Sequence, residues 1–290
     1  MPEAIVPQPI PSVPEAAPQA GVDLAAYTAR IGFDGVPTPT IETLRRLIVK
    51  HAAAIPFEAI DVLLDRGIDL SPAAVDAKLI RARRGGYCFE ENGLFRRVLA
   101  TIGFEVEPLL ARVRWMQPAD APPTPRTHMV LKVVVDGEAW LADVGFGSSV
   151  PTAPLRLATS EPQPTGNGDY RILPFAGGLR LELQTADGWT PLYEVGLEPQ
   201  FDIDFEVANW FTGTHPTSHF RHRLSVTRSV PGRRYALLEN RFTVRGPDGE
   251  AEQRLLSADE IERTLAEIFG LPVEVAWRPI IEKAAAAQTA

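Results

Sequence analysis

The chain has 290 residues, of which 45% are hydrophobic and 23% charged, and its 29 Lys and Arg against 37 Asp and Glu give a net charge of −8. This composition is typical of a soluble globular protein with a large core and about two domains. An acidic chain is a poor partner for nucleic acid or an anionic membrane, because both select basic surfaces. No apolar stretch reaches the roughly 18 residues that a membrane span needs.

The N-terminus and the cysteine content indicate the compartment. Residues 1–21 contain six prolines and lack the basic start and apolar run of a secretory signal. We expect a disordered, proline-rich leader there, because the segment holds too little apolar surface to offset the entropy of ordering. The single cysteine, Cys88, excludes an intrachain disulfide and zinc sites built from several thiolates. A reducing, cytoplasmic location is therefore expected.

Residues 22–104 carry the periodicity of helices. The predicted helices begin at Leu24, at Ile41 after an N-cap at Thr40, at Pro72 after an N-cap at Ser71, and at Phe89. The last of them runs to Ile102 and ends at Gly103, a favoured C′ residue.

From residue 105 to about 205 the hydrophobic period shortens to two, as in strands. Two Asp-Gly pairs, at 136–137 and 187–188, separate strand-like runs and favour type I′ hairpins. Residues 206–290 are mixed, with strands expected around 221–230 and 235–244. A helix follows, opened by the capping box that starts at Ser257.

Cys88 lies at the expected start of the last of the helices in residues 22–104, after two arginines and two glycines. A thiol attacks only as thiolate, and the free N–H groups and positive dipole end of a helix favour that anion. The glycines allow a tight turn that leaves the sulfur accessible. The alternative is a buried, inert cysteine. We expect Arg83 and Arg84 to pair with Glu90 or Glu91 rather than with phosphate.

A nucleophilic thiol also needs a base, and the base needs an orienting group. His128 begins a strand-like run that passes through an Asp-Gly turn and returns to Asp143. A two-residue turn pairs Val135 with Glu138, which makes His128 and Asp143 diagonal neighbours on one face, about 7–8 Å apart at the backbone. A one-residue slip would place them on opposite faces. An incidental surface pair is the alternative.

Three blocks together resemble the arylamine N-acetyltransferases: RGGYCFE at 84–90, Thr127-His128, and DVGFG at 143–147. The first and last blocks are highly specific. Shorter blocks around residues 27–32, 55–61 and 209–220 extend the resemblance over roughly residues 22–275. Ala59 stands where the family usually has Asn, a minor departure.

The resemblance implies an α+β multi-domain fold with a cysteine-protease-like catalytic core. Its parts would be an N-terminal helical bundle at 22–104 that carries the nucleophile, a central β-barrel at 105–205 that carries His and Asp, and a C-terminal α/β lid at 206–290. These parts coincide with the helical, strand-rich and mixed zones of the sequence.

The resemblance also implies a catalytic triad of Cys88, His128 and Asp143. Cys88 would attack the thioester of acetyl-CoA, and the acetyl group would then pass to an arylamine, hydrazine or N-hydroxyarylamine. His128 would take the thiol proton and Asp143 would fix the imidazole tautomer. The Cys88 N–H at the helix start would serve as an oxyanion donor.

Further site residues follow from the resemblance. Phe146 would line the acceptor pocket, and Thr127, Gly147, Thr217 and Phe220 would lie at the CoA site. Acetyl-CoA is the expected acyl-donor co-substrate, without metal or prosthetic group. The histidines at 215, 219 and 222 have helical spacing, but a proline at 216 and strand-like surroundings argue against a metal site. The partners expected are small aromatic amines or hydrazines, and the protein is expected to be a monomer or homodimer.

Three other functions fit the same motifs. Related amide synthases close macrolactams with the same three blocks. A hydrolase would let water deacylate the same triad. A non-enzymatic binding module is disfavoured because all three triad positions are intact.

Overall fold

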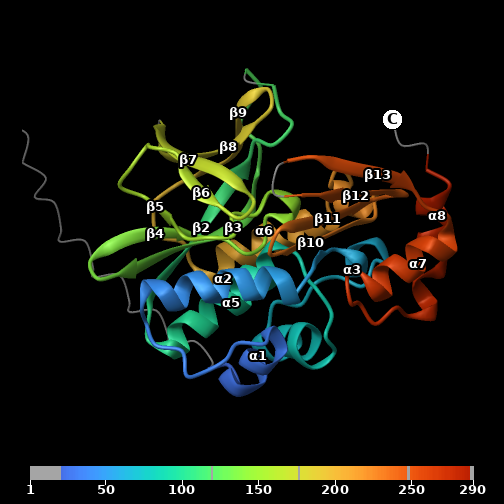
Figure 1. Cartoon of the computed structure of the whole chain (residues 1–290), viewed down its shortest axis with the longest axis horizontal. Helices are drawn as coiled ribbons and strands as arrows, with labels where there is room; N and C mark the ends of the chain where they lie inside the picture. The colour runs from blue at the N-terminus through green and yellow to red at the C-terminus, as the bar shows by residue number, and fades with distance from the viewer. Residues whose placement is uncertain (1–20, 119, 176, 247–248, 288–290) are drawn as a thin grey trace, which may run out of the picture.

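The computed structural model describes residues 21–118, 120–175, 177–246 and 249–287. The expected proline-rich leader lies outside these residues, apart from Gly21. Within them the chain forms an α+β protein with one eight-stranded and one five-stranded antiparallel sheet (Figure 1). No helix in the described part has the length and apolar composition needed to traverse a bilayer.

Residues 21–104 are mostly helical, and the predicted helix starts at Leu24, Ile41 and Pro72 are confirmed. Thr40 accepts a hydrogen bond from the N–H of Thr43, and Ser71 accepts one from Ala74. The elements are α1 (Leu24–Ile31), α2 (Ile41–Ala54), β1 (Phe57–Glu58), α3 (Ile60–Leu63), α4 (Pro72–Val75), the π-helical η1 (Asp76–Arg81) and α5 (Cys88–Ile102). Helix α5 begins at Cys88, one residue earlier than expected.

The eight-stranded sheet curls into a nearly closed barrel, in the order β5-β4-β3-β2-β9-β8-β7-β6 (Figure 1). Its strands are β2 (Glu105–Val113), β3 (Arg126–Val135), β4 (Glu138–Ala142), β5 (Leu155–Arg156), β6 (Gln163–Thr165), β7 (Gly168–Phe175), β8 (Gly178–Thr185) and β9 (Gly188–Val195). The predicted hairpin register is confirmed, since Val135 pairs with Glu138. Asp136 and Gly137 both have positive φ, as a type I′ turn requires.

The C-terminal part departs from expectation in several places. The strand expected around 221–230 begins only at Ser225, because the residues before it form a 3₁₀ turn. The run 235–244 is two strands, since Glu239 has positive φ and turns the chain. Helices α6 and α8 were not anticipated. The elements are η2 (Gly147–Ser149), α6 (Asp202–Thr214), η3 (His219–Arg221), β10 (Ser225–Val230), β11 (Arg233–Leu238), β12 (Arg241–Arg245), β13 (Ala251–Leu255), α7 (Ala258–Glu267), η4 (Val275–Trp277) and α8 (Arg278–Ala285).

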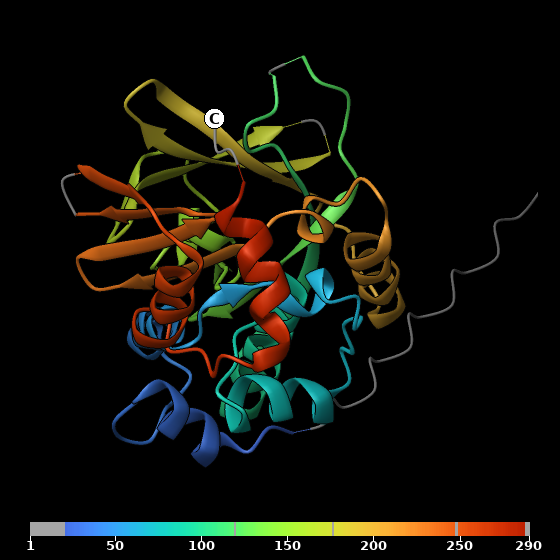
Figure 2. The ribbon, with the colours of Figure 1, turned by 90° about the vertical axis from the view of Figure 1, so that its right-hand side faces the viewer.

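Strand alternation decides which way β3 presents its residues. Met129 and Leu131 belong to the core shared with the N-terminal helices, and α5 packs against β2 and β3 on that side. Val130 belongs instead to the core inside the curled sheet. His128 is two residues from Val130 and therefore faces the same interior. A separate core joins the five-stranded sheet to α7 and α8, which lie along one of its faces (Figure 2).

Candidate active site

Cys88 is the first residue of α5 and is only 3% exposed. The Glu90 carboxylate accepts a hydrogen bond from the N–H of Tyr87, at 3.1 Å, which fixes the entry into the helix. Close packing explains why glycine precedes this helix. A Cβ on Gly85 would lie 1.9 Å from the carbonyl oxygen of Pro56. The expectation that the glycines leave the sulfur accessible does not hold, because Cys88 is buried.

The arginine preceding these glycines pairs elsewhere than expected. Arg84 lies 2.8 Å from the Glu58 carboxylate and 3.2 Å from that of Asp61. The carboxylate of Glu90 pairs with Lys78, at 2.7 Å. The predicted Arg84 contact to Glu90 or Glu91 is wrong, because β1 runs beside residues 84–86 and brings Glu58 within reach.

His128 and Asp143 form a buried ion pair. The imidazole Nε2 lies 2.7 Å from Oδ2 of Asp143, and the two residues are 2% and 0% exposed. Burial alone would lower the pKa of His128, but the charge and hydrogen bond of Asp143, with a smaller contribution from Cys88, raise it to about 10. Burial opposes ionisation of Asp143, yet His128 and further hydrogen bonds hold its pKa below the usual value. The pair is thus arranged to stabilise an imidazolium.

Asn92 ties the cysteine helix to this pair. Its Nδ2 donates to Oδ1 of Asp143 at 3.0 Å and to the carbonyl of Met129 at 2.8 Å, while its Oδ1 accepts from the N–H of Val144. Sequence reasoning missed Asn92. Its place four residues after Cys88, on the same face of a helix, was the available signal.

The sulfur lies against the strand that carries His128. Cys88 Sγ is 3.6 Å from the carbonyl oxygen of Thr127. The structure therefore brings together the three residues expected to form the triad: the thiol at a helix start, the imidazole and the carboxylate. Such a set can generate a thiolate beside an imidazolium.

Two aromatic side chains enclose the imidazole. The ring centroids of Phe146 and Tyr193 lie 4.8 Å and 5.0 Å from that of His128. Burial, together with the nearby Asp143 carboxylate, raises the pKa of Tyr193. The buried Tyr193 hydroxyl has no hydrogen bond of good geometry among the described residues. Tyr193 lies on β9, far along the chain, and the sequence held no local signal for it.

Of the residues expected at the CoA site, Phe220 and Gly147 lie near the start of α5, whereas Thr217 does not contact the triad. Phe220 contacts Tyr87 and Phe57, with ring centroids 5.8 Å and 5.9 Å away, and so lies near the start of α5. Gly147 approaches the same Phe57 ring. Thr217 is exposed and bonded to His215, and no contact joins it to the triad.

Glu91 is the unexpected member of this region. It is fully buried, and neither carboxylate oxygen has a hydrogen-bond partner within the described residues. Its pKa is raised well above the usual value by burial and by the negative groups Glu90, Cys88, Asp143 and Glu58. Burial and these neighbours therefore favour the neutral, protonated form of Glu91.

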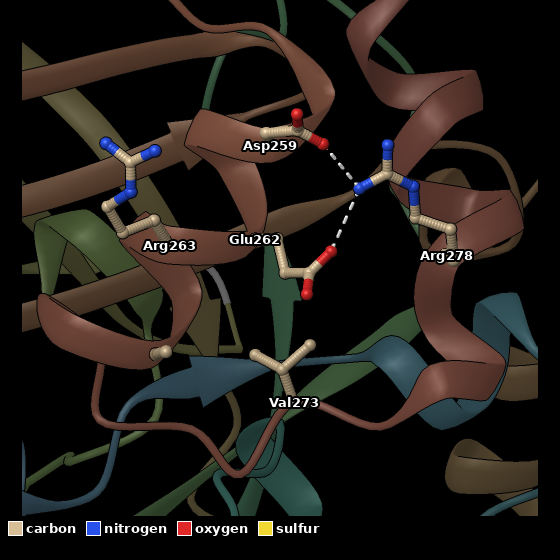
Figure 3. Close-up of a pocket in the computed structure, with 6 residues that line it drawn as sticks. Asp259, Glu262, Arg263, Val273 and Arg278 are labelled. Atoms are coloured by element: carbon tan, nitrogen blue, oxygen red, sulfur yellow. Dashed lines mark hydrogen bonds and ion pairs between the residues drawn. The ribbon is translucent and has the colours of Figure 1, made fainter.

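A surface hollow and a group of three histidines lie outside the triad. A hollow of about 360 Å³ between α7 and α8 is lined mainly by charged residues, and Arg278 already pairs there with Asp259 and Glu262 (Figure 3). The histidines at 215, 219 and 222 lie around the end of α6 and η3, not in strands as expected. No group of three or more metal-ligand side chains occurs in the described part of the chain.

Comparison with known proteins gives consistent matches. An N-acetyltransferase family model matches residues 40–278. The arylamine N-acetyltransferase of Mycobacterium tuberculosis is 41% identical over 87% of this chain and 90% of its own. The Salmonella typhimurium arylamine N-acetyltransferase / N-hydroxyarylamine O-acetyltransferase is 42% identical over 86% of this chain and 89% of its own. The structure of Mycobacterium marinum arylamine N-acetyltransferase in complex with CoA superposes with a TM-score of 0.86 at 39% identity, covering 91% of this chain and 98% of the other.

Proposed function

Because this chain belongs to the arylamine N-acetyltransferase family, we propose that it transfers acetyl from acetyl-CoA to aromatic amines, hydrazines or N-hydroxyarylamines through a thioester on Cys88. The observation that carries the proposal is the juxtaposition of Cys88, at the start of α5, with the buried His128–Asp143 pair. The relative with bound CoA supports the donor, and the names of the relatives support arylamines and N-hydroxyarylamines as acceptors.

The first half-reaction loads the cysteine. His128 takes the Cys88 proton, and Asp143 stabilises the resulting imidazolium, so the titration belongs to the pair. The thiolate attacks the carbonyl carbon of acetyl-CoA. At the start of helix α5, the Cys88 N–H can donate to the developing oxyanion. One such donor typically raises the rate by about 10²–10³. Collapse expels the CoA thiolate, which receives the proton from His128.

The second half-reaction transfers the acetyl group from Cys88 to the acceptor. The acceptor nitrogen attacks the thioester carbonyl, and His128 receives the proton that the nitrogen loses as Cys88 thiolate departs. Aromatic amines suit this step because they are neutral at pH 7 and attack without prior deprotonation. Phe146 offers an apolar ring beside His128 against which the acceptor ring can pack. Thr127, Gly147, Thr217 and Phe220 are proposed to contact CoA.

The test is release of CoA thiol from acetyl-CoA, with and without an aromatic amine or hydrazine, for the wild type and Cys88→Ala. We expect amine-dependent release that disappears in the variant, and an acetyl-sized mass gain on the wild-type protein without amine. Equal release without amine would identify a hydrolase instead. No release and no mass gain would overturn the acetyl-CoA assignment and favour an amide synthase.

A further inference from the structure

The five-stranded sheet has two unlike faces. One face packs on α7 and α8 through apolar residues such as Leu237 and Phe242. The register places a different set on the other face, in three rows across β10–β13: Ser229, Arg234, Arg245 and Ala251; Thr227, Ala236, Thr243 and Gln253; Ser225, Leu238, Arg241 and Leu255. These rows contain several polar residues and three arginines but no carboxylate.

Two of these arginines lie directly opposite each other. Arg234 on β11 pairs with Arg245 on β12, so the two guanidinium groups share one face of adjacent strands. Like charges in this arrangement are destabilising. Within the described residues neither arginine forms an ion pair, and Arg234 donates only to the carbonyl of Ser148, at 3.4 Å. Arg234 is half-buried and Arg245 is exposed, and neither has an anionic partner among the described residues.

The arginine pair adjoins the proposed active site. Ser148, which Arg234 contacts, is the fifth residue after Asp143, and a chain of that length spans at most about 18 Å. Gly147 meets the same sheet face, since a Cβ there would lie 3.6 Å from Oγ1 of Thr227. The acid-free face thus begins beside the segment that carries Asp143, Phe146 and Gly147.

We propose that Arg234 and Arg245 form a phosphate-binding site for the nucleotide end of the acyl donor; this rests on the proposed function. Guanidinium groups match phosphate oxygens in bidentate geometry, and a phosphate between the two would remove their mutual repulsion. The chain as a whole has a net charge of −8 and repels a polyanionic donor. A local basic face is what allows such a donor to dock.

The test compares acetyl-CoA with S-acetylpantetheine, which has the same thioester but no phosphate. In Arg234→Gln and Arg245→Gln we expect the preference for acetyl-CoA, as the ratio of kcat/KM values, to fall about tenfold, mostly through the KM for acetyl-CoA. Arg233→Gln is the matched control, because Arg233 is exposed and lies at the adjacent position whose side chain points to the other face. Arg234→Lys keeps the charge without the fork and should retain part of the preference.

Acetyl-dephospho-CoA locates the contact. If the variants lose their defect with this donor, the 3′-phosphate binds the pair; if the defect persists, the diphosphate does, and either result supports the site. An unchanged preference in both glutamine variants, folded as judged by circular dichroism, would overturn the site while the acetyltransferase function stands. If the wild-type protein turns over neither acetyl-CoA nor S-acetylpantetheine, the proposed function itself is overturned.

Discussion

Gly145 occupies a position where a side chain has no room. A Cβ there would lie 2.8 Å from the Cα of Cys88 and 3.0 Å from Nδ2 of Asn92, where ordinary contacts begin at 3.4 Å. The nearer atom is backbone and cannot rotate away. Gly145→Ala must therefore separate the first turn of α5 from the Asp143 segment by about 0.6 Å.

Two effects follow from that displacement. Overpacking of this kind costs about 1–3 kcal/mol of unfolding free energy. Misplacing a nucleophile by about 1 Å costs on the order of 10² in rate, so a shift of this size should slow acylation roughly tenfold or more. The measurement is the single-turnover release of CoA from acetyl-CoA, alongside denaturant unfolding.

Gly93 provides the control within the same helix. A Cβ on Gly93 meets nothing within 4 Å, and replacing a mid-helix glycine by alanine typically stabilises by about 0.5–1 kcal/mol. Gly93→Ala should therefore be more stable than the wild type and acylate at the wild-type rate. Wild-type stability and acylation in Gly145→Ala would refute the tight packing of Cys88 against the Asp143 segment.

Three further outcomes are expected. Asn92→Ala removes the donor to Asp143 and the acceptor for Val144, so denaturant unfolding should show a loss of about 2–3 kcal/mol; a loss below 0.5 kcal/mol would contradict these bonds. In Asp143→Asn the pKa of His128 should fall from about 10 towards its ordinary value, as an NMR titration would reveal, with acylation slower by on the order of 10²–10⁴. Glu91 has a raised pKa in the folded state, so its contribution to stability declines as the pH rises above the ordinary value of 4.5. Glu91→Gln should therefore gain Tm relative to the wild type between pH 4.5 and 8, and an equal difference at both pH values would argue against a buried neutral acid.

Helix starts and the hairpin register could be predicted because residues close together in the sequence determine them. Caps at Thr40 and Ser71 predicted helix starts, and one Asp-Gly turn fixed the register that brings His128 near Asp143. The partners of Arg84 escaped prediction because Glu58 and Glu274 lie 26 and 190 residues away and meet it only in the fold.

Helix α6 escaped prediction for a different reason. Its outer face carries Ile203, Val207 and Trp210, which are 60%, 61% and 66% exposed. Its inner face is apolar as well, with Phe205 and Ala208 in the core. A helix that is apolar on both sides has no clear amphipathic period, so its sequence does not stand out from the strands around it.

Strand β1 has a consequence for how the chain can be divided. Phe57 and Glu58 form the end of the five-stranded sheet by pairing with β10, although the other four strands come from residues 225–255. A C-terminal fragment produced alone would expose the unpaired edge of β10, and bare edges recruit other chains. Such a fragment should aggregate on its own, and a segment containing β1, supplied in trans, should keep it soluble.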